Sequence, residues 1–559
     1  MNAIDLIAIT LFMFIVFLTG MAFSRTSGDN MKSFFAADGA VPWWMNGLSL
    51  FMSFFSAGTF VVWGAIAYAD GLVAVSIQWT MCIAGILIGL FIAPKWQKTK
   101  VLTVAEFITK RLGLEVQKTY TLLFLAVSIF TAGGFLYPVA KIVEVWSGFP
   151  ASYSIVLIGT IMALYTAVGG LWAVVVTGVL QFIVLFAAVI IVVPLALEHV
   201  GGFNAFLSGV PEGYLDLTNG EYSGAFLLSF GLYNLFFIAG NWAFVQRFTT
   251  VASPKDAKKV GWMFGLLYTI SPLLWMLPPM LYRIVDPNLI GTQSEEAYML
   301  MCKAVLPVGM LGLIVGGMVF ATSSSINTTL NISAGVITND IYKRLYPNAT
   351  DAQLVKVGKL ATMGFGLLTI GVALLVPYMG GIVNVILSIA SLTGAAMFLP
   401  PLWTLFSKRQ TGFSVLSTTI FSLLVNLFMK FVAPGLLGIS LSRTNEMILG
   451  VGLPIVLLII FELINKSKNI AIKYELPPEQ TSEDVSEASA NIRGVKIMSL
   501  GIIAVGVLLA GLGILADRSS FLILSVATII FILGSVILYK NNKSRKDILA
   551  KVDDLVEVE

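Results

Sequence analysis

Long apolar segments follow one another through almost the whole chain, with few polar residues between them. A helix needs about 20 apolar residues to cross the hydrocarbon core of a bilayer. About fifteen segments approach this length: 4–22, 46–69, 72–94, 119–144, 153–169, 171–197, 224–248, 260–284, 302–340, 356–376, 381–406, 413–433, 446–465, 496–515 and 520–539. Only 11% of the residues are charged, whereas a soluble domain carries roughly 25%. We therefore predict an all-α polytopic membrane protein surrounded by the lipid bilayer.

Lysine and arginine residues gather on one side of these predicted spans. If the N-terminus lies outside, the inside loops include the basic stretches 95–118 and 255–259. The outside segments 198–223 and 285–301 contain acidic residues and neither lysine nor arginine. Positively charged loops stay on the cytoplasmic side of a membrane. We therefore expect a multi-pass protein of the cell (inner) membrane with an outside N-terminus and a cytoplasmic C-terminus.

Residues typical of catalytic and metal sites are scarce in this chain. His199 is the single histidine, which excludes a metal site built on several histidines. The only cysteines, Cys82 and Cys302, exclude a disulfide framework by their number. The long polar insert 466–495 predicts a partly disordered inside linker rather than a folded domain. We therefore expect that the protein is not an enzyme, and its modest net charge gives no indication of nucleic-acid binding.

Two predicted spans are interrupted by small and polar residues. One interruption is the run 53–59, Ser-Phe-Phe-Ser-Ala-Gly-Thr, and the other is the run 238–241, Ile-Ala-Gly-Asn. Irregular backbone at membrane depth is tolerated only where it is buried in protein or lines a cavity. Interruptions at equivalent positions of two halves indicate a transporter site at the midplane, and these two lie five spans apart. The alternative is close helix packing by small residues.

Hydroxyl and amide side chains cluster in the predicted span 302–340, whose length exceeds one lipid crossing. The run 321–329 reads Ala-Thr-Ser-Ser-Ser-Ile-Asn-Thr-Thr. Such side chains sometimes only bond to carbonyls of the preceding turn. Hard cations, however, prefer oxygen ligands, and freed carbonyls near residue 55 would complete a neutral oxygen site. No acidic or lysine side chain stands out in the middle of this core, which favours sodium over protons as the coupling ion.

Four segments of roughly the first 410 residues have a distinctive order and spacing. They are Trp43-Trp44 with Gly47, Ser49 and Ser56-Ala57; the run 102–107 with Lys110-Arg111; the run 165–177 with Gln181; and Ser324-Ser325 leading to the run 338–343. In order, spacing and residue type they resemble the sodium:solute symporter family. That family includes bacterial sodium/sugar, sodium/proline and sodium/sialate carriers.

The resemblance implies the LeuT-type fold, in which two inverted five-helix repeats form the core and extra helices flank it. The expected parts of the chain are an N-terminal extra helix and inside loop (1–45), a first five-helix repeat (46–197), an outside loop (198–223), a second five-helix repeat (224–406), additional helices (407–465), a polar inside linker (466–495), C-terminal helices (496–540) and an inside tail (541–559).

The resemblance also implies where sodium binds. Carried over by position, the ligands are the backbone carbonyls of Met52, Phe55 and Ala321 and the hydroxyls of Ser324 and Ser325. Many relatives carry an aspartate for a second sodium site at the position of Gly178. Since that aspartate is absent, we expect one sodium ion per cycle.

Five positions correspond to the solute pocket of the sugar carriers, although most differ in residue type. They are Thr59, Gln78, Asn234, Phe237 and Tyr268. These side chains predict a neutral, hydrogen-bonding pocket, which suits a sugar, a polyol or another uncharged solute. A carboxylate is the alternative, because half-helix ends hold anions without any cationic side chain.

The resemblance and the polar pattern together predict sodium-coupled symport of a small organic solute into the cell by alternating access. A sugar or polyol is favoured, and an amino acid or a carboxylate such as proline or sialate is the alternative. A uniporter or a sensor on the same scaffold is also compatible with the fold. The expected partners are the solute, sodium and lipid, with no nucleic acid and no evident obligatory protein partner.

Overall fold

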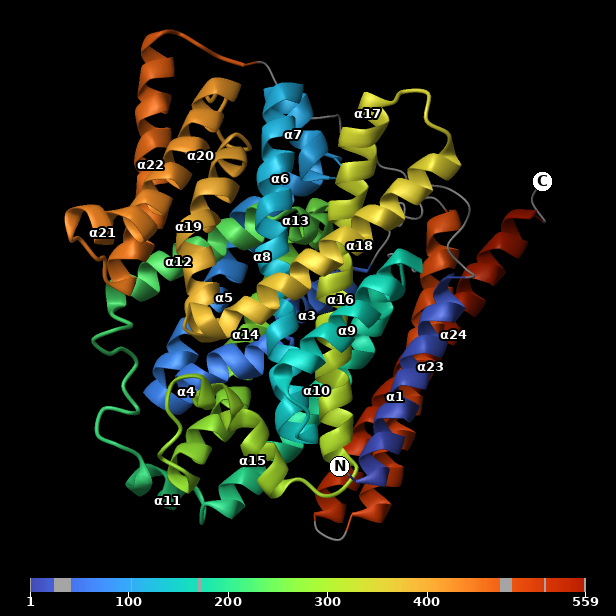
Figure 1. The fold of residues 1–559 in the computed structure, drawn as a ribbon. Helices are drawn as coiled ribbons and strands as arrows, with labels where there is room; N and C mark the ends of the chain where they lie inside the picture. Colours follow the sequence, from blue (N-terminus) through green and yellow to red (C-terminus); the bar gives the residue numbers. More distant parts are fainter. Residues whose placement is uncertain are drawn as a thin grey trace.

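The computed structural model describes residues 2–24, 42–101, 103–168, 172–472, 485–516 and 519–556. Helices and short connections make up this part of the chain, and it contains no β-strand. Figure 1 shows long helices packed into one bundle, with α23 and α24 beside α1 at its edge. The predicted all-α fold is confirmed.

Eleven helices of the described residues are long and apolar enough to cross a membrane, or twelve if the bent pair α12–α13 is one span. The predicted spans 4–22 and 153–169 fall on shorter apolar helices, and 46–69 falls on an interrupted one. The predicted number of spans, about fifteen from the 20-residue criterion, is therefore not confirmed as a count of full-length helices.

The first half of the bundle begins with one separate helix and continues with an interrupted one. Its helices are α1 (Ala3–Ser24), α3 (Trp43–Met52), the π-helix η2 (Thr59–Trp63), α4 (Gly64–Asp70), α5 (Val73–Leu87), the π-helix η3 (Ile88–Ile92), α6 (Ala93–Lys98), α7 (Val104–Leu112), α8 (Leu114–Ser147), α9 (Ala151–Val168) and α10 (Trp172–His199).

The second half also begins with an interrupted helix, which follows a loop that contains α11 (Phe203–Gly209). Its helices are α12 (Gly224–Gly240), α13 (Trp242–Thr249), α14 (Pro254–Val285), the 3-10 helix η4 (Gly291–Glu296), α15 (Ala297–Val305), α16 (Met310–Val336), the π-helix η5 (Ile337–Tyr342), α17 (Lys343–Leu345), α18 (Asp351–Leu375), the 3-10 helix η6 (Val376–Met379) and α19 (Gly381–Trp403).

The remaining helices lie at the edges of the bundle (Figure 1). They are α20 (Gly412–Leu427), the π-helix η7 (Phe428–Val432), α21 (Ala433–Leu437), α22 (Arg443–Ser467), α23 (Val485–Leu515) and α24 (Ser520–Val556). Part of the predicted linker 466–495 is helical, because α23 begins at Val485; residues 473–484 lie outside the described part. Helix α24 also continues into the predicted tail.

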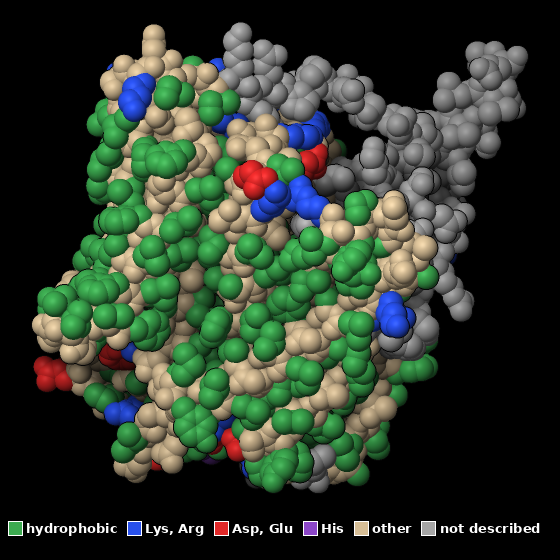
Figure 2. All heavy atoms as spheres, turned by 45° about the horizontal axis from the view of Figure 1, so that its top comes forward, with side chains coloured by type: hydrophobic (Ala, Val, Ile, Leu, Met, Phe, Trp, Pro, Cys, Tyr) green, Lys and Arg blue, Asp and Glu red, His purple; other side chains and the backbone are tan. Residues whose placement is uncertain are grey.

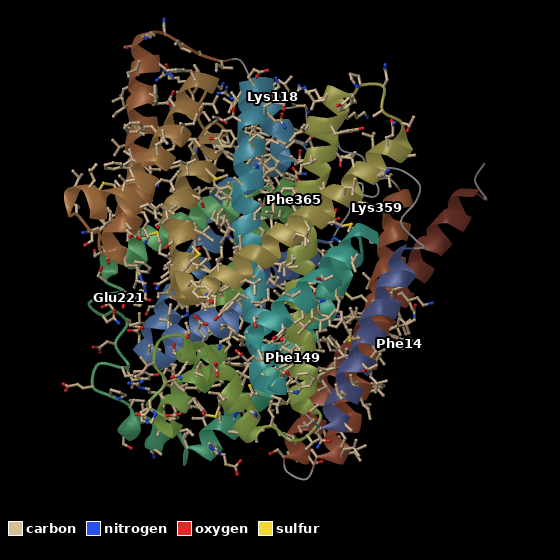
Figure 3. The ribbon with its side chains drawn as sticks, in the orientation of Figure 1. Phe14, Lys118, Phe149, Glu221, Lys359 and Phe365 are labelled. Atoms are coloured by element: carbon tan, nitrogen blue, oxygen red, sulfur yellow. The ribbon has the colours of Figure 1, made fainter. Side chains whose placement is uncertain are left out.

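Apolar side chains cover much of the outer surface of the bundle. Leu228, Leu266 and Leu367 each expose more than 60% of their surface, at 68%, 64% and 70%. The face in Figure 2 is mostly hydrophobic, with Lys and Arg side chains toward its upper part. Figure 3 shows Phe14 pointing away from α1, where it is 56% exposed. This surface matches a chain whose solvent is lipid.

Helices α5 and α14 approach each other closely because both carry glycines at their contact. A Cβ atom added at Gly261 on α14 would lie 2.9 Å from the carbonyl oxygen of Gly85 on α5. Small residues allow membrane helices to pack at short distance. The contact fixes α5, which carries Gln78, against α14, which carries Tyr268.

Helix α16 receives its cap from the first helix of the chain. The carboxylate of Asp5 accepts hydrogen bonds from the backbone N–H groups of Gly309 (2.8 Å) and Gly312 (3.2 Å). A carboxylate at a helix N-terminus satisfies unpaired donors and interacts favourably with the helix dipole. Helix α1 thereby fixes the start of the helix that carries Ala321 and Ser325.

Candidate functional site

The first predicted interruption is present as a break between α3 and η2. Helix α3 ends at Met52, and the chain leaves helical geometry around Ser53–Ser56. The Thr59 hydroxyl donates to the Phe54 carbonyl (2.6 Å) and accepts from the Ser56 N–H (3.1 Å). Thr59 therefore stabilises the break, in addition to lining the cavity described below.

The break leaves two backbone carbonyls without protein partners. Within the described part of the chain, no hydrogen bond is donated to the carbonyl oxygens of Met52 and Phe55. Both residues are buried, with exposed fractions of 5% and 0%. A buried backbone carbonyl normally has a partner, so such a pair is a ready source of cation ligands.

Helix α16 lies directly against this break. Thr322 Oγ1 accepts a hydrogen bond from the Ala57 N–H (2.9 Å) and donates one to the Met318 carbonyl (2.8 Å). The bond joins two segments that are 265 residues apart in the sequence. It fixes the hydroxyl cluster of α16 next to the freed carbonyls of the break.

Four hydroxyls of the 321–329 cluster lie among the described side chains, and they divide into two kinds. The hydroxyls of Ser323, Thr329 and Thr322 each donate to the carbonyl four residues earlier in α16. The Thr322 hydroxyl also accepts the hydrogen bond from Ala57 at the break. The Ser325 hydroxyl makes no hydrogen bond with any described residue, and Ser325 lines the cavity. The Ser324 side chain lies outside the described part of the structure.

The second predicted interruption is also present, between α12 and α13. Helix α12 ends at Gly240, and α13 continues at an angle of 63°. The Asn241 side chain caps α13 by accepting from the Ala243 N–H (3.0 Å). The Trp96 indole donates to the Ala239 carbonyl (2.8 Å), which satisfies a backbone group near the end of α12.

Residues of both breaks line one cavity of about 220 Å³. Helix α8 also contributes, through side chains from Phe124 to Phe135. Figure 3 shows Lys118 near the upper end of the bundle and Phe149, just after α8, in its lower half. Since the lining residues fall between these ends of α8, the cavity lies inside the bundle, at the depth expected for a transporter site.

The cavity contains most of the residues predicted for sodium and solute. Met52, Ala321 and Ser325 line it, whereas Phe55 is buried and is not part of the lining. Of the predicted solute residues, the lining includes Thr59, Asn234, Phe237 and Tyr268.

Gln78 is the predicted solute residue that the cavity does not include. It is buried at 1% exposure, and its Nε2 atom has no hydrogen-bond partner in the described structure. A buried unpaired amide is unfavourable. The role of Gln78 in solute binding stays a prediction.

The other predicted solute residues make either hydrogen bonds or ring contacts with neighbouring side chains. Asn234 Nδ2 donates to Thr80 Oγ1 (2.9 Å). Phe237 contacts the rings of Phe54 and Phe244. Tyr268 packs its ring against Phe264.

Arg247 is a cavity residue that the sequence analysis missed. Its side chain is the one charged group among the described residues that line the cavity. Its Nε donates to Ser49 Oγ at 2.9 Å, which joins α13 to α3. The predicted solute positions carry neutral side chains, but the cavity as a whole also contains this charge. Arg247 lies near the end of the predicted span 224–248, and α13 continues at an angle after Gly240.

The neutral oxygens of Met52, Phe55 and Ser325 have the chemistry that sodium prefers. Hard cations take carbonyl and hydroxyl ligands. Within the described residues there is no group of three or more His, Cys, Asp or Glu side chains suited to a metal. The side chains of residues 165–178 lie outside the described part, so the role of the Gly178 position stays an expectation.

Comparison with known proteins gives consistent matches over most of the chain. The model of the sodium:solute symporter family matches residues 34–421. The sodium/glucose cotransporter of Vibrio parahaemolyticus is 28% identical over 77% of this chain and 86% of its own length. Sodium/glucose cotransporter 1 of Ovis aries is 26% identical over 73% of this chain and 68% of its own length.

Solved structures share the fold. The substrate-bound, outward-open structure of a Na⁺-coupled sialic acid symporter matches with a TM-score of 0.70 and 20% identity, over 85% of this chain and all of the other. A closed nucleobase-cation-symport-1 family transporter with bromovinylhydantoin bound matches with a TM-score of 0.50 and 14% identity, over 82% of this chain and 98% of the other. These likenesses confirm the LeuT-type fold.

Proposed function

Because this chain belongs to the sodium:solute symporter family, we propose that it couples sodium entry to the uptake of a small organic solute through the cavity between its two broken helices. The protein is a multi-pass membrane transporter rather than an enzyme. In the proposed orientation, the ends of the helices rich in lysine and arginine face the cytoplasm of a cell with an inner membrane.

The proposed sodium site joins the first break to α16. Its ligands would be the carbonyls of Met52, Phe55 and Ala321 together with the hydroxyls of Ser324 and Ser325. The unpaired carbonyls at the break and the unpaired Ser325 hydroxyl, all among the described residues, support this assignment. Since Gly178 replaces an acidic residue common in the family, we propose one sodium ion per cycle.

Sodium at this position would connect two elements that move relative to each other. The break belongs to the first repeat and α16 to the second, and Thr322 already joins them through Ala57. A ligand that bridges two elements stabilises the arrangement in which they lie close together. Coupling then follows if the solute favours the same arrangement, and each ligand raises the affinity for the other by an equal factor.

The proposed solute pocket lies beside the sodium site. Its polar side chains, Thr59, Gln78, Asn234 and Tyr268, would bind hydroxyl groups, and the Phe237 ring would pack against the solute body. The relatives named sodium/glucose cotransporters support a hydroxylated solute. A carboxylate-bearing solute is the second candidate, because Arg247 adds a positive charge to the cavity.

Uptake by proteoliposomes tests the proposal. Solute uptake from a panel of sugars, polyols, amino acids and carboxylates should require an inward sodium gradient. Replacing Ser325 by Ala should raise the half-saturating sodium concentration roughly 10- to 150-fold, if one hydrogen-bond-type contact to a charge contributes about 1.5–3 kcal/mol. Uptake that proceeds equally well in potassium would instead indicate a uniporter.

Ser323→Ala provides the matched control. Ser323 lies two residues away on the same helix, but its hydroxyl donates to the Val319 carbonyl (2.6 Å). Loss of this hydroxyl should leave the sodium dependence unchanged. If both serine variants changed it equally, the effect would come from the helix rather than from the proposed ligand.

A further inference from the structure

Trp275 on α14 is a large buried side chain to which the proposed transport function gives no role. It is 1% exposed, and it does not line the cavity. Its Nε1 atom is buried without a hydrogen-bond partner in the described structure. An unpaired N–H group is unfavourable in the interior of a protein. The contacts of the ring, rather than a hydrogen bond, therefore account for this indole.

Trp275 stacks on the ring of Phe55, the residue whose carbonyl is a proposed sodium ligand. The two ring centroids lie 4.5 Å apart, and the ring planes meet at 24°. The ring of Phe51, near the end of α3, lies 5.8 Å from the indole at 30°. Stacked aromatic rings have a preferred geometry. The indole therefore limits how the rings on both sides of the end of α3 can turn.

The ring of Phe55 anchors a residue whose carbonyl has no described hydrogen-bond donor. Phe55 is 0% exposed and does not line the cavity, so its side chain lies in the packed interior. Besides the indole, its ring contacts Phe60 on η2, with centroids 5.3 Å apart. The Phe55 carbonyl accepts no hydrogen bond within the described part of the chain. Because the ring and the carbonyl belong to one residue with only two soft backbone dihedral angles, packing around the ring limits the directions that the carbonyl can take.

The indole itself is supported by α14 rather than by the break. Tyr268, about two helical turns earlier, lies edge-on to Trp275 with ring centroids 5.9 Å apart. Helix α14 packs closely on α5, since a Cβ atom added at Gly265 would lie 3.0 Å from the Cys82 carbonyl oxygen. A ligand supported by a packed helix keeps its geometry better than a ligand on an unsupported loop.

We infer that Trp275 is a positioning residue for the sodium site, because its indole holds the Phe55 ring so that the Phe55 carbonyl stays directed toward α16. The inference rests on the proposed sodium site and goes beyond it, since Trp275 is not a proposed ligand and does not reach the cavity. A site whose ligands are already held in the bound arrangement binds more tightly than one that must order them on binding. Loss of the indole should therefore lower sodium affinity although every proposed ligand remains.

Sodium binding to the purified full-length protein tests the inference. Trp275→Leu removes the stacked pair and should raise the half-saturating sodium concentration roughly 2- to 13-fold, the factor that corresponds to one aromatic pair. Trp275→Phe keeps a ring against Phe55 and loses only the unpaired N–H group, so it should retain the wild-type affinity. A role in general packing alone would not make sodium affinity depend on an aromatic ring at this position.

Phe55→Leu removes the same stacked pair from the other side, while its backbone carbonyl remains. It should weaken sodium binding as Trp275→Leu does, and the double variant should lose no more affinity than either single variant. If Trp275→Leu does not fold, Phe55→Leu and Trp275→Phe still test the stack. Trp146→Leu is the matched control, because it removes an α8 indole whose Nε1 atom also has no described partner and which lies outside the cavity lining. Sodium affinity should be unchanged in this control.

Several results would overturn the inference. These are wild-type sodium affinity in folded Trp275→Leu or Phe55→Leu, equal losses in Trp275→Phe and Trp275→Leu, or losses that add in the double variant. If sodium binding were still weakened in Ser325→Ala alongside any of these results, the proposed sodium site would stand without the positioning role. Absence of sodium binding to the wild-type protein would refute the sodium site itself.

Discussion

Replacing Thr322 by Val should weaken the connection between α16 and the break that follows α3. The Thr322 hydroxyl is fully buried at 0% exposure, as is Ala57, whose N–H it accepts at 2.9 Å. Valine has a similar shape but no acceptor, so the Ala57 N–H would be left buried and unpaired. Such a donor costs about 1–3 kcal/mol.

The same free energy sets the expected effect on sodium. If the unpaired donor destabilises only the arrangement that binds sodium, the half-saturating sodium concentration rises by about 5- to 150-fold. The melting temperature of purified protein in sodium should fall in parallel. Sodium titration of thermal stability measures both quantities on one sample.

Two controls make this prediction specific. Thr322→Ser keeps the hydroxyl and should retain wild-type sodium affinity. Thr10→Val removes an exposed hydroxyl of α1 that donates to the Leu6 carbonyl (2.7 Å), and should have little effect. If Thr322→Val matched Thr322→Ser in both melting temperature and sodium affinity, the connection would not contribute to sodium binding.

Three other substitutions test further parts of the molecule. Gln78→Leu removes a buried amide nitrogen that has no partner among the described residues, so thermal stability should not fall. Solute affinity should drop at least tenfold. A loss of stability with unchanged solute affinity would contradict this prediction. The Glu295 carboxylate accepts hydrogen bonds from the Tyr137 hydroxyl (3.0 Å) and the Ile382 N–H (2.9 Å). Burial raises the pKa of Glu295, so this carboxyl group holds its proton up to a higher pH in the folded protein than in the unfolded chain. As the pH falls from 7 toward the usual glutamate pKa of about 4.3, the melting temperature of the wild type should therefore rise relative to Glu295→Gln; a pH-independent difference would refute it. Gly261→Ala should lower stability by about 1–3 kcal/mol through overpacking, whereas Gly452→Ala, with open space around it, should not.

The two helix breaks were predictable because small and polar residues interrupt apolar runs there. The runs 53–59 and 238–241 both fall where the structure leaves helical geometry. Lipid cannot satisfy a freed backbone group, so the residues that allow a break carry a strong sequence signal. The same reasoning locates the hydroxyl cluster of α16 beside the first break.

The segment 302–340 was predicted to be too long for one lipid crossing, and it contains the end of α15, all of α16 and part of η5. Helix α15 ends at Val305 and α16 begins at Met310. Pro307 and Gly309, with a φ of +89°, separate them. This signal was present in the sequence, since proline and glycine together end helices, but the surrounding apolar residues masked it.

The charge in the cavity was not predictable from the apolar pattern. Arg247 lies near the end of its predicted span, where basic residues normally mark the membrane surface. Only the direction of α13 after the 63° bend places it along the cavity. Likewise, hydrophobicity cannot indicate that Gln78 and Phe55 are buried outside the lining of the cavity, because that depends on how the helices are rotated.

Direct sodium binding to the purified protein tests the central claim, that neutral oxygens of the first break and of α16 form the coupling site. Binding of radioactive sodium should be saturable in the wild type and in Ser323→Ala. In Ser325→Ala it should be weaker by roughly 10- to 150-fold, the loss expected for one contact to a charge. Equal sodium affinity in Ser325→Ala and the wild type would contradict the assignment of the site.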